Sequence, residues 1–208
     1  MTIDPMAVTK YDRSDAELER FWTFCVLVAG KNADWAALKV NDLYASAERQ
    51  GMTPFAYLRE NRHALHNLLV ANRVGQYHRI EKALEASLEL DLRTCTIAEL
   101  EAIFGVGPKT ARFFVLHTRR DAQCAVLDTH VLRWMARTLG PSFDRHEIPT
   151  STPPSRVYLR LEQLCLALMR STFPGMTLAE ADLLIWCLES GRLQGDMFAK
   201  HELPGVEQ

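Results

Sequence analysis

The sequence lacks any long hydrophobic run. Although 48% of its 208 residues are apolar, no stretch approaches the roughly 18 consecutive apolar residues that a helix needs to span a bilayer. Residues 1–15 also lack the basic and apolar regions of a secretory signal peptide. These absences predict a protein that has no membrane partner and lies in the cytoplasm.

Cysteine is scarce and scattered. The cysteines are odd in number, and no two stand at a spacing typical of metal ligands. Most lie within apolar stretches, which is typical of reduced thiols in a core rather than of disulfides. They are Cys25, Cys95, Cys124, Cys165 and Cys187.

Any sustained alternation of polar and apolar residues, the pattern typical of strands, is also absent. Apolar residues recur instead at three- and four-residue spacing, which predicts an all-α fold. Helices are expected near residues 14–29, 33–49, 54–59, 61–72, 76–89, 96–102, 108–118, 129–139, 155–171 and 177–189. Three of them begin at a predicted capping box, formed by Ser14 with Glu17, Thr96 with Glu99, and Thr177 with Glu180. The proline-rich residues 141–154 are the clearest loop.

The net charge is small, at −2, so the protein is not coated with positive charge. Basic residues are nevertheless concentrated in one stretch. Residues 109–145 contain seven basic residues and three acidic ones, a local excess of four positive charges. Such a concentration is typical of a face that binds nucleic acid.

The most informative segment is LEAIFGVGPKTAR, residues 100–112. It predicts a short helix, a Gly-x-Gly turn and a second helix, which is the signature of a helix-hairpin-helix. Glycines in the turn allow positive φ and a close approach of the backbone to another molecule, and Pro108 suits the first turn of the second helix. The free amides there can bind a DNA phosphate. We therefore expect DNA contacts at Gly105, Val106, Gly107, Thr110 and Arg112.

By itself, this hairpin also occurs in proteins that only clamp DNA, with the lysine beside a phosphate. A second motif, AVLDTHVLR at residues 125–133, places an Asp at the start of a helix 19 residues after Lys109. With both motifs, the chain resembles the endonuclease III superfamily of DNA glycosylases. The resemblance makes Lys109 the nucleophile and Asp128 the essential carboxylate.

The resemblance implies base excision coupled to strand cleavage. The amine of Lys109 would attack the sugar C1′, displace the damaged base and leave a Schiff base, which permits β-elimination of the 3′ phosphate. The attacking amine has to be neutral, a form that desolvation and neighbouring cations such as Arg112 favour. Asp128, held ionised by amides at a helix start, would stabilise the cationic sugar and help to deprotonate the lysine.

Outer segments most resemble the small archaeal-type 8-oxoguanine DNA glycosylase/lyases, which lack an iron–sulfur cluster. Residues 24–33 resemble the first core helix and the loop that probes the DNA stack, residues 72–79 the arginine-bearing turn, and residues 180–186 the last helix. The close four-cysteine array of the iron–sulfur members is missing here. Further expected DNA contacts are Asn32, Arg79 and Arg133, and the expected base pocket contains Trp186 and Asp182.

The resemblance also implies two helical subdomains flanking a DNA-binding cleft. Residues 31–124 would form a six-helix domain with the hairpin, and residues 1–30 plus 125–208 a second domain carrying Asp128. The expected partner is double-stranded DNA containing a damaged base, bound by a monomer in the nucleoid. No cofactor is expected, although turn carbonyls from Phe104 to Val106 are placed to hold Na⁺ or K⁺.

One departure concerns the lesion. The archaeal-type enzymes finish with a lysine that takes part at the base pocket, whereas this chain continues past Gly195 to Gln208 with no terminal lysine. We expect 8-oxoguanine as the substrate, with another oxidised base as an open choice. Two other functions stay open: a glycosylase-fold enzyme acting on hypermodified thymine in phage-type DNA, and a non-catalytic hairpin module that binds DNA.

Overall fold

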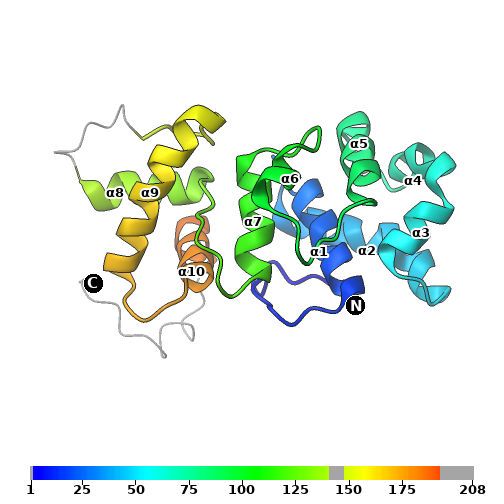
Figure 1. Ribbon diagram of the computed structural model, residues 1–208, viewed down its shortest axis with the longest axis horizontal. Coiled ribbons are helices and arrows are strands. Elements are labelled where there is room, and N and C mark those ends of the chain that lie inside the picture. The colour runs from blue at the N-terminus through cyan, green and yellow to red at the C-terminus, as the bar shows by residue number, and fades with distance from the viewer. Residues whose placement is uncertain (1, 141–147, 193–208) are drawn as a thin grey trace. The chain divides into compact units, whose positions relative to one another are not determined.

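The computed structural model describes residues 2–140 and 148–192 (Figure 1). Within these ranges the protein is helical and contains no strand, which confirms the predicted all-α class. Of the predicted loop, residues 148–154 carry no helix, and residues 141–147 lie outside the described ranges, as does the tail 195–208. The helices are α1 (Asp15–Leu27), α2 (Ala33–Arg49), α3 (Pro54–Glu60), η1 (Arg62–Ala64), α4 (Leu65–Ala71), α5 (Tyr77–Ser87), α6 (Ile97–Glu101), α7 (Pro108–Thr118), α8 (Thr129–Leu139), α9 (Ser155–Thr172) and α10 (Leu178–Ser190).

The helix starts follow local hydrogen bonding. All three predicted capping boxes form: the Ser or Thr side chain accepts the amide of the Glu three residues on, and that Glu accepts the amide of the cap. The helix bounds lie close to those expected, except that the helix predicted at 61–72 is divided into the 3-10 turn η1 and the helix α4. Caps are decided by neighbours in the sequence, so the sequence suffices to place them.

The chain forms two compact units, unit 1 (residues 1–121) and unit 2 (residues 122–208). In unit 1, α1 is the central helix and packs against α2, α3, α5 and α7. The ring of Phe21 lies 6.1 Å from that of Phe114 on α7, and the buried indole of Trp22 donates a 2.7 Å hydrogen bond to Ser87 Oγ. Each contact buries apolar area or satisfies a polar group in the core.

The N-terminal residues belong to unit 1, which differs from the expected division into 31–124 and 1–30 plus 125–208. Besides the packing of α1, Arg13 donates a 2.9 Å hydrogen bond to the carbonyl of His117, and the Lys10 amide donates to the same carbonyl over 3.1 Å. These bonds attach the segment before α1 to the last turn of α7.

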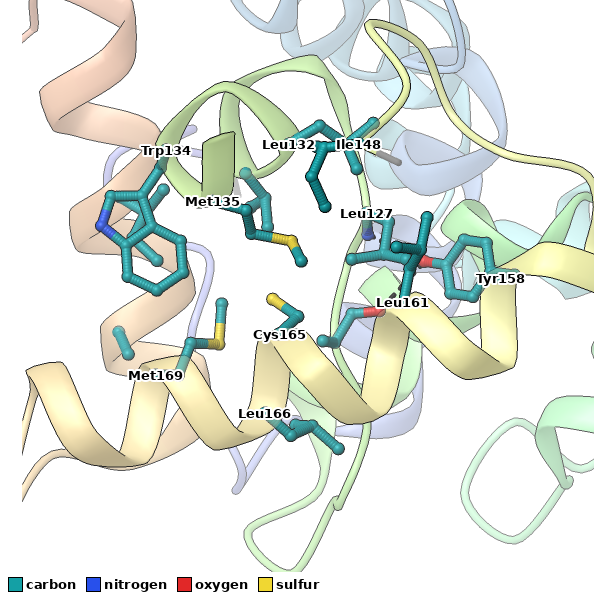
Figure 2. Close-up of a cluster of buried hydrophobic side chains, with 14 of the residues drawn as sticks. Leu127, Leu132, Trp134, Met135, Ile148, Tyr158, Leu161, Cys165, Leu166 and Met169 are labelled. Atoms are coloured by element: carbon teal, nitrogen blue, oxygen red, sulfur yellow. Dashed lines mark hydrogen bonds between the residues drawn. The ribbon is translucent and has the colours of Figure 1, made fainter. Parts of the chain in front are cut away.

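In its described part, unit 2 consists of the irregular segment 122–127 followed by α8, α9 and α10. Its core is a cluster of buried side chains, drawn in Figure 2. Met135 from α8 and Cys165 from α9 point toward each other there, and the ring of Trp134 stacks on that of Phe173 at 5.8 Å. The apolar faces of these helices therefore bury one another.

All five cysteines lie in the described residues, and all are buried and free. The interpretation of them as reduced core thiols is confirmed. None of the helices in the described ranges is both long and apolar enough to cross a bilayer.

Candidate functional site

The turn between α6 and α7 requires glycine at one of its two glycine positions. Gly105 has φ +81°, and a Cβ there would lie 2.4 Å from Cγ of Arg79. Gly107 has φ −96°, and a Cβ there would meet no atom within 4 Å. Gly105 thus serves the conformation of the turn and the packing of Arg79, whereas Gly107 leaves open space above its backbone.

The first turn of α7 has amides that the helix does not use. Gly107 is its N-cap and offers no side-chain acceptor, and the first backbone bond of the helix runs from the Ala111 amide to the Gly107 carbonyl over 3.2 Å. The amides of Lys109 and Thr110 therefore have no partner within the helix. Such amides, at the positive end of the helix dipole, favour an anion.

Lys109 is the second residue of α7, after Pro108, and is partly exposed. Burial raises the pKa of the Cys25 thiol on α1, and the positive charges of Arg13 and Lys109 partly offset this effect. The ammonium of Lys109 thus lies within electrostatic reach of the interior of unit 1. Its Nζ makes no hydrogen bond or ion pair within the described part of this unit, and its side chain is partly exposed, so the amine can be reached from solvent.

Two of the predicted DNA contacts on α7 are buried instead. Thr110 and Arg112 each retain only 6% exposure, and the Arg112 guanidinium pairs with Glu101 on α6. Arg112 therefore joins α6 and α7 rather than presenting a free charge on the surface. The pairing also neutralises the charge by which Arg112 was expected to favour a neutral Lys109.

Arg79, on α5, holds the turn between α6 and α7 through its guanidinium. Its Nη1 donates to the Gly105 carbonyl over 3.1 Å, its Nη2 to the Val26 carbonyl over 3.0 Å, and its Nε to Gln76 Oε1 over 2.7 Å. Partial burial lowers the pKa of this guanidinium. Arg79, predicted to contact DNA, is thus engaged by carbonyls of its own unit.

Lys31 links the turn before α2 to the turn before α5. Its Nζ donates to the carbonyl of Val74 and lies 4.3 Å from the centre of the Trp35 ring. Desolvation, followed by the nearby charge of Arg79, lowers the pKa of this amine. The turns that precede α2, α5 and α7 are therefore held together in unit 1 by two basic side chains.

Asn32 and Phe104 lie on these turns. Asn32, a predicted DNA contact, is exposed, but its Oδ1 caps α2 by accepting the amides of Asp34 and Trp35 at 2.9 and 3.1 Å. Phe104 is 62% exposed, and its ring meets that of His78 edge-on at 5.7 Å. An exposed aromatic ring beside the hairpin was not predicted; its signal in the sequence was an apolar residue directly before the Gly-x-Gly turn.

In unit 2, Asp128 is the N-cap of α8, as predicted. Its Oδ1 accepts the amides of His130 and Val131, both at 2.9 Å. Both bonds use the same oxygen, and Oδ2 makes no hydrogen bond within the described residues. The carboxylate is therefore held in place through one oxygen while the other can face a partner.

The two residues of the predicted base pocket differ in exposure. Trp186 is partly exposed: the guanidinium of Arg192 lies 5.0 Å from the centre of its ring, and His130 meets it edge-on at 6.3 Å. Asp182 is only 5% exposed. Together with burial, the charges of Asp182, Glu162 and Asp128 raise the pKa of the Cys165 thiol, so these carboxylates lie near one buried sulfur.

Arg133 remains on the surface of α8, with 61% of its side chain exposed. Its Nη1 lies 3.8 Å from Glu189 Oε2, and Arg137 Nη2 lies 2.6 Å from Glu189 Oε1. Both arginines thus stabilise the contact of α8 with α10. The exposed guanidinium of Arg133 is still accessible to a phosphate.

The two central residues each lie at the start of a helix, Lys109 in unit 1 and Asp128 in unit 2. No family model, curated protein or solved structure matches the chain. Any function assigned to it has therefore to come from the chemistry of its own residues. In the described ranges, no group of three His, Cys, Asp or Glu side chains is placed to hold a metal ion.

Two polar side chains of α9 near Asp128 were not predicted as part of the site. Tyr158 and Glu162 are 1% and 4% exposed and hydrogen-bond to the backbone just before Asp128. Their signal was weak but present: two polar residues four apart stand on the apolar face of a helix, and a buried polar side chain must have a partner.

Proposed function

We propose that the protein is a DNA glycosylase with lyase activity, in which Lys109 is the nucleophile and Asp128 the essential carboxylate. Lys109 attacks C1′ of the damaged nucleotide as the bond from C1′ to the base breaks, and the base leaves with a proton. The C1′–O4′ bond of the sugar then opens, O4′ takes up a proton, and the resulting protonated Schiff base acidifies the C2′ proton. β-Elimination then breaks the bond to the 3′ phosphate. The substrate is double-stranded DNA with an oxidised base, for which 8-oxoguanine is the first choice.

The position of Lys109 carries this proposal. An accessible amine stands at the second position of α7, beside two amides without helical partners and behind a turn that only glycine allows. A phosphate bound by these amides would bring the sugar of its nucleotide close to the amine. A hairpin that only binds DNA needs the free amides at the start of α7, but it does not need the amine of Lys109 to be without an ion-pair partner.

The geometry of Asp128 supports the same chemistry. The α8 amides that bond Oδ1 stabilise the ionised carboxylate, and Oδ2 can face a cationic sugar. A plain cap would serve the helix equally well as Asn, Ser or Thr. A carboxylate at this position is required only if its charge acts on a substrate.

The lesion is the less constrained part of the proposal. The guanidinium of Arg192 lies over the ring of Trp186, so a base that stacked on this ring would have to displace it. Asp182 is too buried to meet a base edge without movement of its surroundings. The lyase chemistry needs neither residue, so it can hold for an oxidised base other than 8-oxoguanine.

The experiment is a strand-cleavage assay on labelled duplexes that carry an abasic site, 8-oxoguanine or no lesion. The wild-type protein should cleave the first two, and Lys109→Gln should cleave neither while still binding them. Cleavage of the abasic duplex alone would retain the lyase and reject 8-oxoguanine as the lesion. Binding without any cleavage by the wild type would reject the enzyme and leave a DNA-binding module.

A further inference from the structure

The segment that leads to Asp128 is buried and irregular, with no strand beside it in the described ranges. Ala125, Val126 and Leu127 are at most 2% exposed. The backbone amides and carbonyls of such a segment must find hydrogen-bond partners, because leaving them unpaired away from water is costly. In a sheet, the next strand would supply those partners.

Here two side chains of α9 supply them. The hydroxyl of Tyr158 accepts the Leu127 amide over 2.8 Å and donates to the Ala125 carbonyl over 3.0 Å. Glu162, one helical turn further on, accepts the Ala125 amide over 3.0 Å. Figure 2 shows Tyr158 beside Leu127, with the ring of the tyrosine within the core cluster. One face of α9 thus takes the place of a neighbouring strand.

Tyrosine is suited to this position because a hydroxyl both donates and accepts. A single phenolic oxygen therefore satisfies an amide and a carbonyl two residues apart. Phenylalanine would fill the same space and leave both backbone groups without partners. A carboxylate could accept from the amide but could not donate to the carbonyl.

The same contact fixes Asp128. The peptide that joins Leu127 to Asp128 begins at the residue held by Tyr158, and the Asp128 amide donates back to the Val126 carbonyl over 2.9 Å. The Asp128 side chain then caps α8. Tyr158 of α9 thus holds the backbone just before Asp128, and the first amides of α8 hold its carboxylate. A shift of the backbone at Leu127 would therefore move the carboxylate.

We infer that Tyr158 is a positioning residue, whose hydroxyl sets the place of the Asp128 carboxylate by holding the peptide before it. This role deepens the proposed function and rests on it for its effect on the reaction. The hydroxyl acts only through Asp128 and does not touch the DNA. Removing it should therefore slow the chemical step and leave DNA binding unchanged, because none of the side chains expected to contact DNA is altered.

The first test is single-turnover cleavage of an abasic duplex by Tyr158→Phe. The matched control is Tyr44→Phe, because Tyr44 is also fully buried and its hydroxyl also has a partner, Thr23 Oγ1 at 2.7 Å in unit 1. Each change removes one oxygen, and rates are compared at a temperature where circular dichroism shows both variants folded. We expect a roughly tenfold to hundredfold lower rate for Tyr158→Phe, with unchanged duplex affinity, and the wild-type rate for Tyr44→Phe.

A double variant separates positioning from general destabilisation. Because Tyr158 acts through Asp128, Tyr158→Phe combined with Asp128→Asn should be no slower than Asp128→Asn alone. The inference would be overturned if the double variant were slower than Asp128→Asn by the same factor that Tyr158→Phe alone loses. A wild-type cleavage rate in Tyr158→Phe would also overturn it.

A second measurement does not depend on activity. Amide hydrogen exchange should become faster in Tyr158→Phe at Leu127 and also at His130 and Val131, the two amides capped by Asp128, with no such change in Tyr44→Phe. Acceleration at Leu127 alone would show that the hydroxyl holds the peptide but does not place the carboxylate, and would overturn the inference. If the wild type cleaves no abasic DNA, the proposed function fails, and the exchange at His130 and Val131 still decides whether Tyr158 positions Asp128.

Discussion

Arg79 Nη1 donates a 3.1 Å hydrogen bond to the carbonyl of Gly105, the residue of positive φ in the turn between α6 and α7. This bond attaches the turn to α5 and places a guanidinium at one of the carbonyls where the sequence favours Na⁺ or K⁺. Arg79 also bonds the Val26 carbonyl at the end of α1. The turn that presents Lys109 is thus fixed from two other helices of unit 1, and the rigidity of the proposed site can be tested at these contacts.

The two glycines of the turn should differ in their effect on stability. Gly105→Ala forces a side chain into a left-handed conformation and toward Arg79, so it should lower the free energy of unfolding by about 1–3 kcal/mol. Gly107→Ala meets open space at negative φ and should change it by less than about 0.5 kcal/mol. Urea denaturation measures both, and equal losses would argue against the close approach of Arg79.

Substitutions at Asp128 should separate the cap from the chemistry. Asp128→Asn keeps an oxygen for the amides of His130 and Val131, so stability should stay nearly unchanged, whereas Asp128→Ala should lose about 1 kcal/mol. Both should slow strand cleavage of an abasic duplex strongly, leaving a small residual rate. Thr53→Ala, which removes the cap of α3, is the control: it should cost similar stability and leave cleavage intact. Full activity in Asp128→Asn would make Asp128 a cap and nothing more.

Two arginines predicted to contact DNA should behave in opposite ways. Arg112→Gln breaks a buried pair with Glu101 and should lower the free energy of unfolding by about 1–3 kcal/mol. Arg133→Gln removes an exposed charge and should leave stability within about 1 kcal/mol of wild type. The second change should weaken duplex binding and reduce the slope of its salt dependence by about one. Titrations at several salt concentrations check this, and an unchanged slope would remove Arg133 from the interface.

Stability should fall as the pH rises above the ordinary thiol pKa of 9.0. Burial raises the pKa of Cys25 in the folded protein, so its thiol stays protonated at a pH where the unfolded chain loses the proton. Ionisation then favours the unfolded state, and the contribution present below the unfolded pKa is lost as the pH increases. Urea midpoints measured between about pH 8 and about pH 10 should decline more steeply for wild type than for Cys25→Ala. Parallel declines would show that this thiol ionises equally well in both states.

Those parts of the fold that depend on neighbours in the sequence could be predicted. Ser14, Thr96 and Thr177 mark helix starts because the Glu that completes each capping box stands three residues away. The cap formed by Asp128 was predictable for the same reason. The division into units was not, because it depends on which partners bury the aromatic face of α1, and those partners are distant in the sequence.

The candidate site shows the same limit. The sequence places Lys109 and Asp128 at helix starts, since each is set by a turn or a cap within a few residues. It assigns DNA contacts to Arg79 and Arg112 because basic residues near a hairpin suggest phosphate. Whether a guanidinium meets a phosphate or a carbonyl of its own unit depends on packing, and the partners Gly105 and Glu101 lie in other helices or turns. Tyr158 acts on Leu127 from 31 residues away, beyond the reach of any local pattern.

The most direct test of the central claim is trapping of the Schiff base with borohydride on a labelled duplex carrying an abasic site. Reduction converts the imine between Lys109 and C1′ into a stable covalent adduct, visible as a slower band in a denaturing gel. We predict an adduct with the wild-type protein and none with Lys109→Gln, at protein concentrations that saturate the duplex in both cases. No adduct with the wild type, or an equal yield from Lys109→Gln, would contradict the assignment of Lys109 as the nucleophile.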